Sequence, residues 1–186
     1  MRLGLPAAFL LCAGCNAQSL QGSLTAVLTL EYTHATLSIA ADQAALTFLR
    51  PVPIGDVIDA GAAATSEDTV FKVVTYLTGA TLAAAKGCKV DANCTAPEVC
   101  YLGSCAFDLS QILPGTMNQQ RGQLSRFVLN DPVQTFPPIQ RGDFYVTGNP
   151  VLGKNVGGYF TVTFTEGIDE ASGRTVYGGF SAKVVP

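Results

Sequence analysis

The sequence of 186 residues contains no tryptophan, one histidine and two methionines. Only 13% of its residues are charged, about half of the usual share, and the formal net charge is −3. This balance leaves no basic surface of the kind that neutralises a phosphate backbone, so we expect no nucleic acid among the partners. Because 48% of the residues are hydrophobic, we expect a folded domain with a substantial core.

Long apolar runs are also lacking, and no stretch reaches the roughly 18 residues that a membrane span requires. The longest candidate is at the N-terminus, where Met1-Arg2 precedes an apolar stretch from Leu3 to Leu11 and then small residues. This order is typical of a secretory signal peptide, which we assign to residues 1–14. The sequence therefore predicts export.

The end of this segment, Ala13-Gly14-Cys15, resembles the signal of bacterial lipoproteins, in which small residues precede a cysteine that is lipidated and becomes the mature N-terminus. The resemblance implies a lipid on Cys15, a tether at residues 15–22 and anchoring to the bacterial cell envelope, with the outer membrane favoured. Such a chain is held at a membrane by its acyl chains without spanning it. The alternative is cleavage after Ala17, which gives a freely secreted protein.

Four of the six cysteines lie within 18 residues: Cys88, Cys94, Cys100 and Cys105. In an exported chain this density predicts two disulfides. A zinc site is the alternative, but its ligands usually occur in pairs two to four residues apart, and the gaps here are five, five and four residues, which suits zinc badly. We therefore expect no metal and no cofactor, and the spacing alone leaves all three disulfide pairings open.

The run from Cys88 to Cys105 resembles the Dickkopf-type N-terminal cysteine-rich segment, which also occurs in bacterial surface lipoproteins. The shared positions, besides the cysteines, are Asp91, Glu98-Val99 and Gly103. The resemblance implies that Cys88 pairs with Cys100 and Cys94 with Cys105. We assign residues 86–107 to a small disulfide knot inserted between strands, which depends on its bridges because it is too small to bury a core.

Two-residue alternation of apolar and polar side chains is the strongest pattern in the rest of the chain, and it predicts strands. It is clearest in three segments, and five weaker segments bring the total to about eight strands: 23–33, 159–165 and 175–184, then 35–40, 44–50, 69–78, 125–130 and 143–147. Glu166 to Gly173 is expected to be a hairpin loop, and Ala80 to Ala85 the start of a short helix. The predicted domain, residues 23–186, is an antiparallel β-sandwich, with a β-barrel as the alternative.

Catalytic motifs are missing. His34 is the only imidazole, and we expect it at the rim of the sandwich, with Glu31 on the opposite strand face. The sequence has no Gly-x-Ser-x-Gly elbow, no His-Glu-x-x-His and no phosphate-binding glycine loop. We therefore expect no enzyme, although a hydrolase whose two carboxylates are distant in sequence stays an alternative.

Three further patterns have simple structural explanations. Glu166, Asp169 and Glu170 offer oxygen ligands for calcium, but turn acids are usually solvated. Arg141-Gly142-Asp143 spells an integrin-type tripeptide, for which a turn before a strand is the better explanation. A binding platform or ordinary half-buried strand positions explain the tyrosines at 32, 76, 101, 159 and 177.

Together these features predict a non-enzymatic, membrane-anchored lipoprotein of the cell envelope whose β-sandwich has a structural role or binds a partner. That partner would be a protein or a glycan. The first alternative is a carbohydrate-binding or adhesion module that uses the loops at one end of the sandwich, including the knot.

Overall fold

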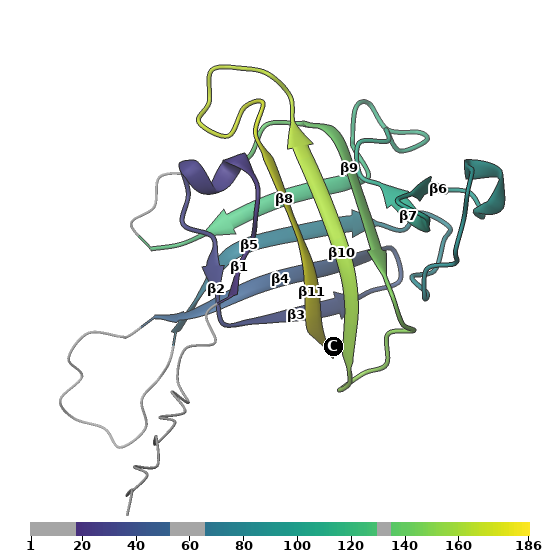
Figure 1. Ribbon diagram of the computed structural model, residues 1–186, viewed down its shortest axis with the longest axis horizontal. Helices are drawn as coiled ribbons and strands as arrows, with labels where there is room; N and C mark the ends of the chain where they lie inside the picture. The colour runs from purple at the N-terminus through teal and green to yellow at the C-terminus, as the bar shows by residue number, and fades with distance from the viewer. Residues whose placement is uncertain (1–17, 53–65, 130–134) are drawn as a thin grey trace, which may run out of the picture.

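The computed structural model describes residues 18–52, 66–129 and 135–186 (Figure 1). The predicted signal peptide, Cys12 and the predicted lipidation site Cys15 lie outside the described residues. In these three ranges the regular structure is all β, apart from the short 3-10 helices η1 (Ser23–Ala26) and η2 (Asp91–Asn93). None of the helices described there has the length and apolar character needed to cross a membrane.

The strands form two sheets. A small sheet pairs β1 with β2, and a large sheet has the order β6-β7-β9-β10-β11-β3-β4-β5-β8. All neighbours are antiparallel except β11 and β3, which are parallel. Their bounds are β1 (Gln18–Ser19), β2 (Glu31–Tyr32), β3 (His34–Ile39), β4 (Gln43–Val52), β5 (Ser66–Tyr76), β6 (Glu98–Tyr101), β7 (Ser104–Asp108), β8 (Gly122–Phe127), β9 (Ile139–Val146), β10 (Asn155–Phe164) and β11 (Thr175–Val185).

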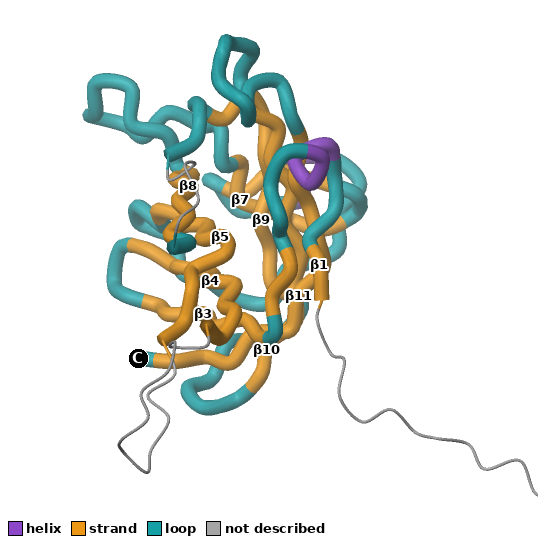
Figure 2. The backbone as a smooth tube through the Cα atoms, turned by 90° about the vertical axis from the view of Figure 1, so that its left-hand side faces the viewer, coloured by secondary structure: helices purple, strands orange, loops and turns teal. Residues whose placement is uncertain are grey.

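The large sheet folds over on itself to make the predicted sandwich. Strands β9, β10 and β11 cross β3, β4, β5 and β8 steeply, and the two groups lie on opposite sides of the core (Figures 1 and 2). Phe160 of β10 joins the two layers, because its ring centroid lies 5.6 Å from that of Phe48 and 6.0 Å from that of Phe71. The sheet ends at β6 and β8, which do not pair with each other, so it is not a closed barrel.

The alternation in β10 and β11 has the predicted result, because the apolar side chains enter the core and the threonines and tyrosines face outward. Gly158 interrupts this pattern for a steric reason. The rings of Phe144 and Phe180, from the strands on either side of β10, stack at 5.9 Å. A Cβ atom on Gly158 would lie 2.3 Å from the Phe180 ring, so only glycine fits.

The predicted long strand over 23–33 is wrong. Residues 23–26 form η1, and only Glu31 and Tyr32 are in a strand. Leu24 and Leu28 are both buried because they are one helical turn apart, and Leu28 N donates to Leu24 O. Gly22 starts the turn at φ 114°, with its Cα packed against the Thr175 carbonyl.

Residues 18–22, which the sequence assigns to the tether, contribute to the folded domain. Gln18 and Ser19 form β1, and Leu20 is only 2% exposed in the core. The expected helix after Ala80 is not formed either, since the segment is extended and Ala84 makes a parallel β-bridge with Val146. The loop between β10 and β11 is found at Glu166 to Gly173 as predicted.

The disulfide knot is an extension of the large sheet. Its hairpin, β6 and β7, pairs with β9 at Phe107 and Asp108. The bridges are Cys88–Cys100 and Cys94–Cys105, the pairing that the resemblance implies. Asp91 braces the knot, because its Oδ1 accepts a hydrogen bond from Cys100 N at 2.8 Å.

Candidate functional site

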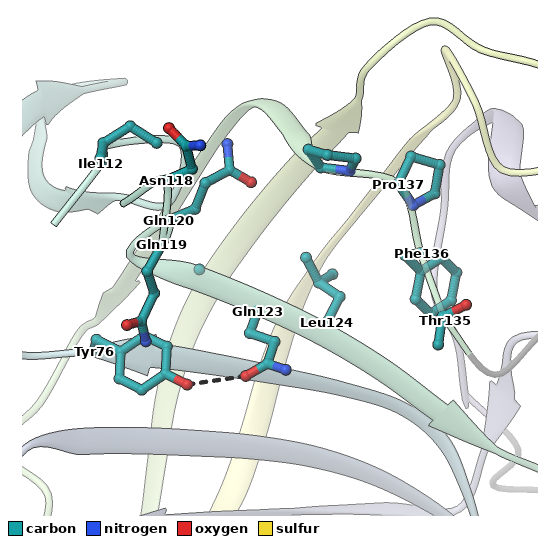
Figure 3. Close-up of a pocket in the computed structure, with 12 residues that line it drawn as sticks. Tyr76, Ile112, Asn118, Gln119, Gln120, Gln123, Leu124, Thr135, Phe136 and Pro137 are labelled. Carbon is teal, nitrogen blue, oxygen red and sulfur yellow. Dashed lines mark hydrogen bonds between the residues drawn. The ribbon is translucent and has the colours of Figure 1, made fainter. Parts of the chain in front are cut away.

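A groove of about 750 Å³ follows the edge strand β8 (Figure 3). Among the described residues, twelve line it, and they come from the end of β5, the irregular segment 112–120, β8 and the segment 135–138. None of the twelve carries a charge. We call this feature the amide groove, because Asn118, Gln119, Gln120 and Gln123 all line it.

The groove opens where the segment 135–138 stops pairing with β8. Ser125 still makes a β-bridge with Thr135, but the chain then passes through Pro137 and Pro138, which have no N–H to pair with β8. Gln120 spans the gap instead. Its Oε1 accepts from Ile139 N at 2.7 Å, and its Nε2 donates to Ile139 O at 2.6 Å. The Gln120 side chain therefore fixes the wall of the groove and is not available to a ligand.

Arg121 fixes the loop that carries the groove residues. Its side chain is among the most deeply buried, and burial lowers the pKa of its guanidinium. Nε donates to Gln111 Oε1 at 2.9 Å, and a terminal nitrogen donates to Tyr76 O at 2.7 Å. The guanidinium also lies 5.9 Å from the centroid of the Phe107 ring. These contacts hold the irregular segment against the end of β5 and the knot hairpin.

The remaining polar groups of the groove face the solvent. Tyr76 Oη donates to Gln123 Oε1 at 2.9 Å, as drawn in Figure 3. Within the described chain, the Gln123 amide nitrogen and the side-chain amides of Asn118 and Gln119 make no hydrogen bond. Asn118 also has φ 89°, a strained value for a residue other than glycine. An uncharged ligand with hydroxyl groups finds both donors and acceptors here, beside the Tyr76 ring.

A second feature lies on the outer face of β9, β10 and β11. We call it the tyrosine face, which consists of Tyr101, Tyr145, Tyr159, Tyr177 and Asp143. Tyr145 and Tyr159 are in register, with ring centroids 6.1 Å apart. Tyr101 comes from the knot hairpin and hydrogen-bonds to Thr161 of β10. Burial raises the pKa of both Tyr101 and Tyr159.

Asp143 is the half-buried carboxyl of this face. Burial raises its pKa to about 6, and the negative charge of Asp108 adds to the shift. Asp108 lies directly opposite on β7 and accepts hydrogen bonds from the backbone N–H and the hydroxyl of Ser110.

The tripeptide Arg141-Gly142-Asp143 lies inside β9, so the prediction of a turn before the strand is wrong.

His34 is exposed at the start of β3, at the rim as expected. Its Nε2 lies 3.3 Å from Glu67 Oε1, and its Nδ1 lies 3.1 Å from Thr33 Oγ1. The order hydroxyl, imidazole, carboxylate is that of a nucleophile, its general base and the carboxylate that orients the base. However, the Thr33 hydroxyl also donates to Leu49 O at 3.2 Å, and His34 and Glu67 are almost half exposed. This arrangement is that of a surface polar network.

The side chains that the sequence offers as possible metal ligands do not form a metal site in the described part of the chain. Among the described residues, the only group of three potential ligand atoms within 4.8 Å of one another is Cys88, Cys94 and Cys105. Those sulfurs are close because they are in disulfides, which excludes a zinc-thiolate site there. Glu166, Asp169 and Glu170 do not bring three oxygens together.

Sequence reasoning found part of each feature. The sequence offers Tyr76 and three of the four tyrosines of the tyrosine face as candidate binding residues. It does not single out Tyr145 or the amides of the groove. Their one signal is the run Asn118-Gln119-Gln120 in a segment without periodicity, and no pattern links it to Pro137 across the groove.

Comparison with known proteins adds no functional information. No family model matches the sequence, and the searches of curated proteins and of solved structures give no significant match. The functional argument therefore rests on the residues of this chain.

Proposed function

We propose that this protein is a non-enzymatic, lipid-anchored component of the cell envelope whose β-sandwich binds an uncharged glycan in the amide groove. The observation that carries the proposal is the lining of the groove. Free amides and a tyrosine ring are present, and none of the described lining residues is charged.

The chemistry of the groove selects among ligand classes. Phosphorylated and carboxylated ligands need a cation or several backbone N–H groups, and the described lining has no cation. A purely apolar ligand would leave the amides of Asn118, Gln119 and Gln123 without partners. A neutral sugar needs no cation, and it does not leave the amides without partners. Its hydroxyls pair with the amides, and its C–H face packs on an aromatic ring.

The anchor comes from the sequence. Ala13-Gly14-Cys15 supports lipidation of Cys15, and the two disulfides fit an exported protein. The test is the intact mass and detergent partitioning of the protein from a lipoprotein-processing bacterium, beside Cys15→Ala. We expect acyl mass and detergent partitioning only in the wild type. A mature chain that begins at Gln18 without lipid would overturn the anchor but not the groove.

The binding proposal is tested with a panel of neutral hexasaccharides of glucose, xylose, mannose or N-acetylglucosamine. We expect at least one to bind, and Gln123→Ala to weaken it about fivefold, the value of one hydrogen bond. Gln140→Ala is the matched control, because this exposed glutamine of β9 is not among the groove residues. The binding proposal fails if no hexasaccharide binds, or if both variants bind like the wild type.

A further inference from the structure

The tyrosine face combines side chains from four strands that are distant in sequence. Tyr101 comes from β6, Tyr145 and Asp143 from β9, Tyr159 from β10 and Tyr177 from β11. All four rings are half-buried, and the two central ones lie side by side across adjacent strands. Gly179 is the cross-strand partner of Tyr159 on β11, so the residue paired directly with Tyr159 on that strand has no side chain. The result is an aromatic surface on the sheet, with the two central rings inclined by 34° to each other.

Asp143 has no partner on this surface. Within the described chain its carboxyl makes no hydrogen bond and no ion pair, although it is half-buried. The nearest cation on its own strand is Arg141, whose Nε donates to Thr163 Oγ1 at 3.3 Å. A partly buried acceptor without a donor is unfavourable, so a ligand that donates hydrogen bonds here gains free energy.

The charges around Asp143 restrict that ligand. Asp108 from β7 lies opposite Asp143, Thr161 of β10 is its cross-strand partner, and Tyr101 from β6 lies close to it. An anion would be repelled by the two carboxyls, Asp143 and Asp108. A neutral ligand with adjacent hydroxyls avoids this repulsion and can donate hydrogen bonds to Asp143, and its apolar ring face packs on tyrosine.

We propose that the tyrosine face is a second glycan-binding surface, on which a neutral sugar ring stacks on Tyr145 and Tyr159 and donates hydroxyl hydrogen bonds to Asp143. The inference takes its ligand class from the proposed function, but it does not depend on the groove. Two such surfaces on one rigid domain let a long polysaccharide bind more tightly than either surface alone.

Because the chain has no tryptophan, its intrinsic fluorescence comes from its six tyrosines, and a change in this emission reports binding near a tyrosine. The probe is the same panel of neutral hexasaccharides, titrated against the full chain while tyrosine emission is recorded. The titrations use a double variant, Tyr76→Ala with Gln123→Ala, in which the groove is disabled. We expect saturable binding to remain in this variant.

On that background, Asp143→Asn is expected to weaken binding about tenfold, the value of a hydrogen bond to a charged group. Tyr159→Ala should weaken it similarly, while Tyr159→Phe, which keeps the ring, should stay within twofold. Circular dichroism checks that each variant is folded. The inference is overturned if the groove double variant binds nothing, or if Asp143→Asn and Tyr159→Ala leave the remaining affinity unchanged. If the groove double variant binds like the wild type, only the proposal of glycan binding in the amide groove is overturned.

Discussion

The amide groove and the tyrosine face are built in opposite ways. The groove lies beside an edge strand, and irregular segments supply its walls, held in place by Gln120 and the buried Arg121. Apart from Tyr101 of the knot hairpin, the tyrosine face stands on the pleat of β9, β10 and β11, where strand pairing sets each position. The groove therefore depends on a few specific side chains, whereas the face depends on the packing beneath the sheet.

The largest expected difference follows from Arg121. Arg121→Ala leaves Tyr76 O and Gln111 without their donor and creates a cavity next to Phe107, so we expect a loss of about 3 kcal/mol in unfolding free energy. Chemical denaturation measures it. The control is Arg141→Ala on the tyrosine face, whose exposed side chain should change stability by less than about 0.5 kcal/mol. Equal losses in both variants would contradict the comparison.

The packing beneath the face is tested by Gly158→Ala. The new methyl group would meet the Phe180 ring and the Tyr145 carbonyl, so we expect a loss of about 2 kcal/mol, measured by thermal or urea unfolding. Gly148→Ala serves as the control, because its nearest heavy atom is 3.9 Å away and its effect should be small. If the two glycines tolerate alanine equally well, the face does not depend on the stacked rings below it.

Asp143 gives the face a pH dependence that the uncharged groove lacks. Its pKa is raised from 3.8 to about 6, so the protonated form is favoured in the folded state. The stability that it provides is complete below pH 3.8 and is lost as the pH rises through 6. Asp143→Asn should therefore stabilise the protein at pH 7 by about 1 kcal/mol, after allowance for solvent screening, and have no effect at pH 3.5.

The measurement is urea unfolding of both proteins at pH 3.5 and pH 7. Asp169→Asn in the exposed β10–β11 loop is the control, and it should change neither value. A stabilisation by Asp143→Asn that is the same at both pH values would show that the carboxyl charge is not its source.

The contrast also explains what could be predicted from the sequence. In β10 and β11, alternation fixes which residues enter the core, so the strands and the outward tyrosines follow from local pattern. The same pattern failed at residues 23–33, where Leu24 and Leu28 fit one helical turn as well as two positions on one strand face. The disulfide pairing followed from the resemblance of the knot.

The groove could not be predicted because its parts meet only through tertiary contacts. Gln120 and Ile139 are 19 residues apart, and Arg121 reaches Tyr76 across 45 residues. The raised pKa of Asp143 likewise depends first on its burial and then on its alignment with Asp108, and this pairing of β7 with β9 follows from no local pattern.

Glycan binding in the amide groove is tested most directly by NMR of the side-chain amides. The 15N-labelled protein is titrated with the neutral hexasaccharides, and the NH₂ signals are followed. We expect saturable shifts for Asn118, Gln119 and Gln123, a smaller shift for Gln120, whose amide is bound to Ile139, and none for Gln140. Signals from Asn118, Gln119 and Gln123 that stay fixed with every hexasaccharide would contradict the account.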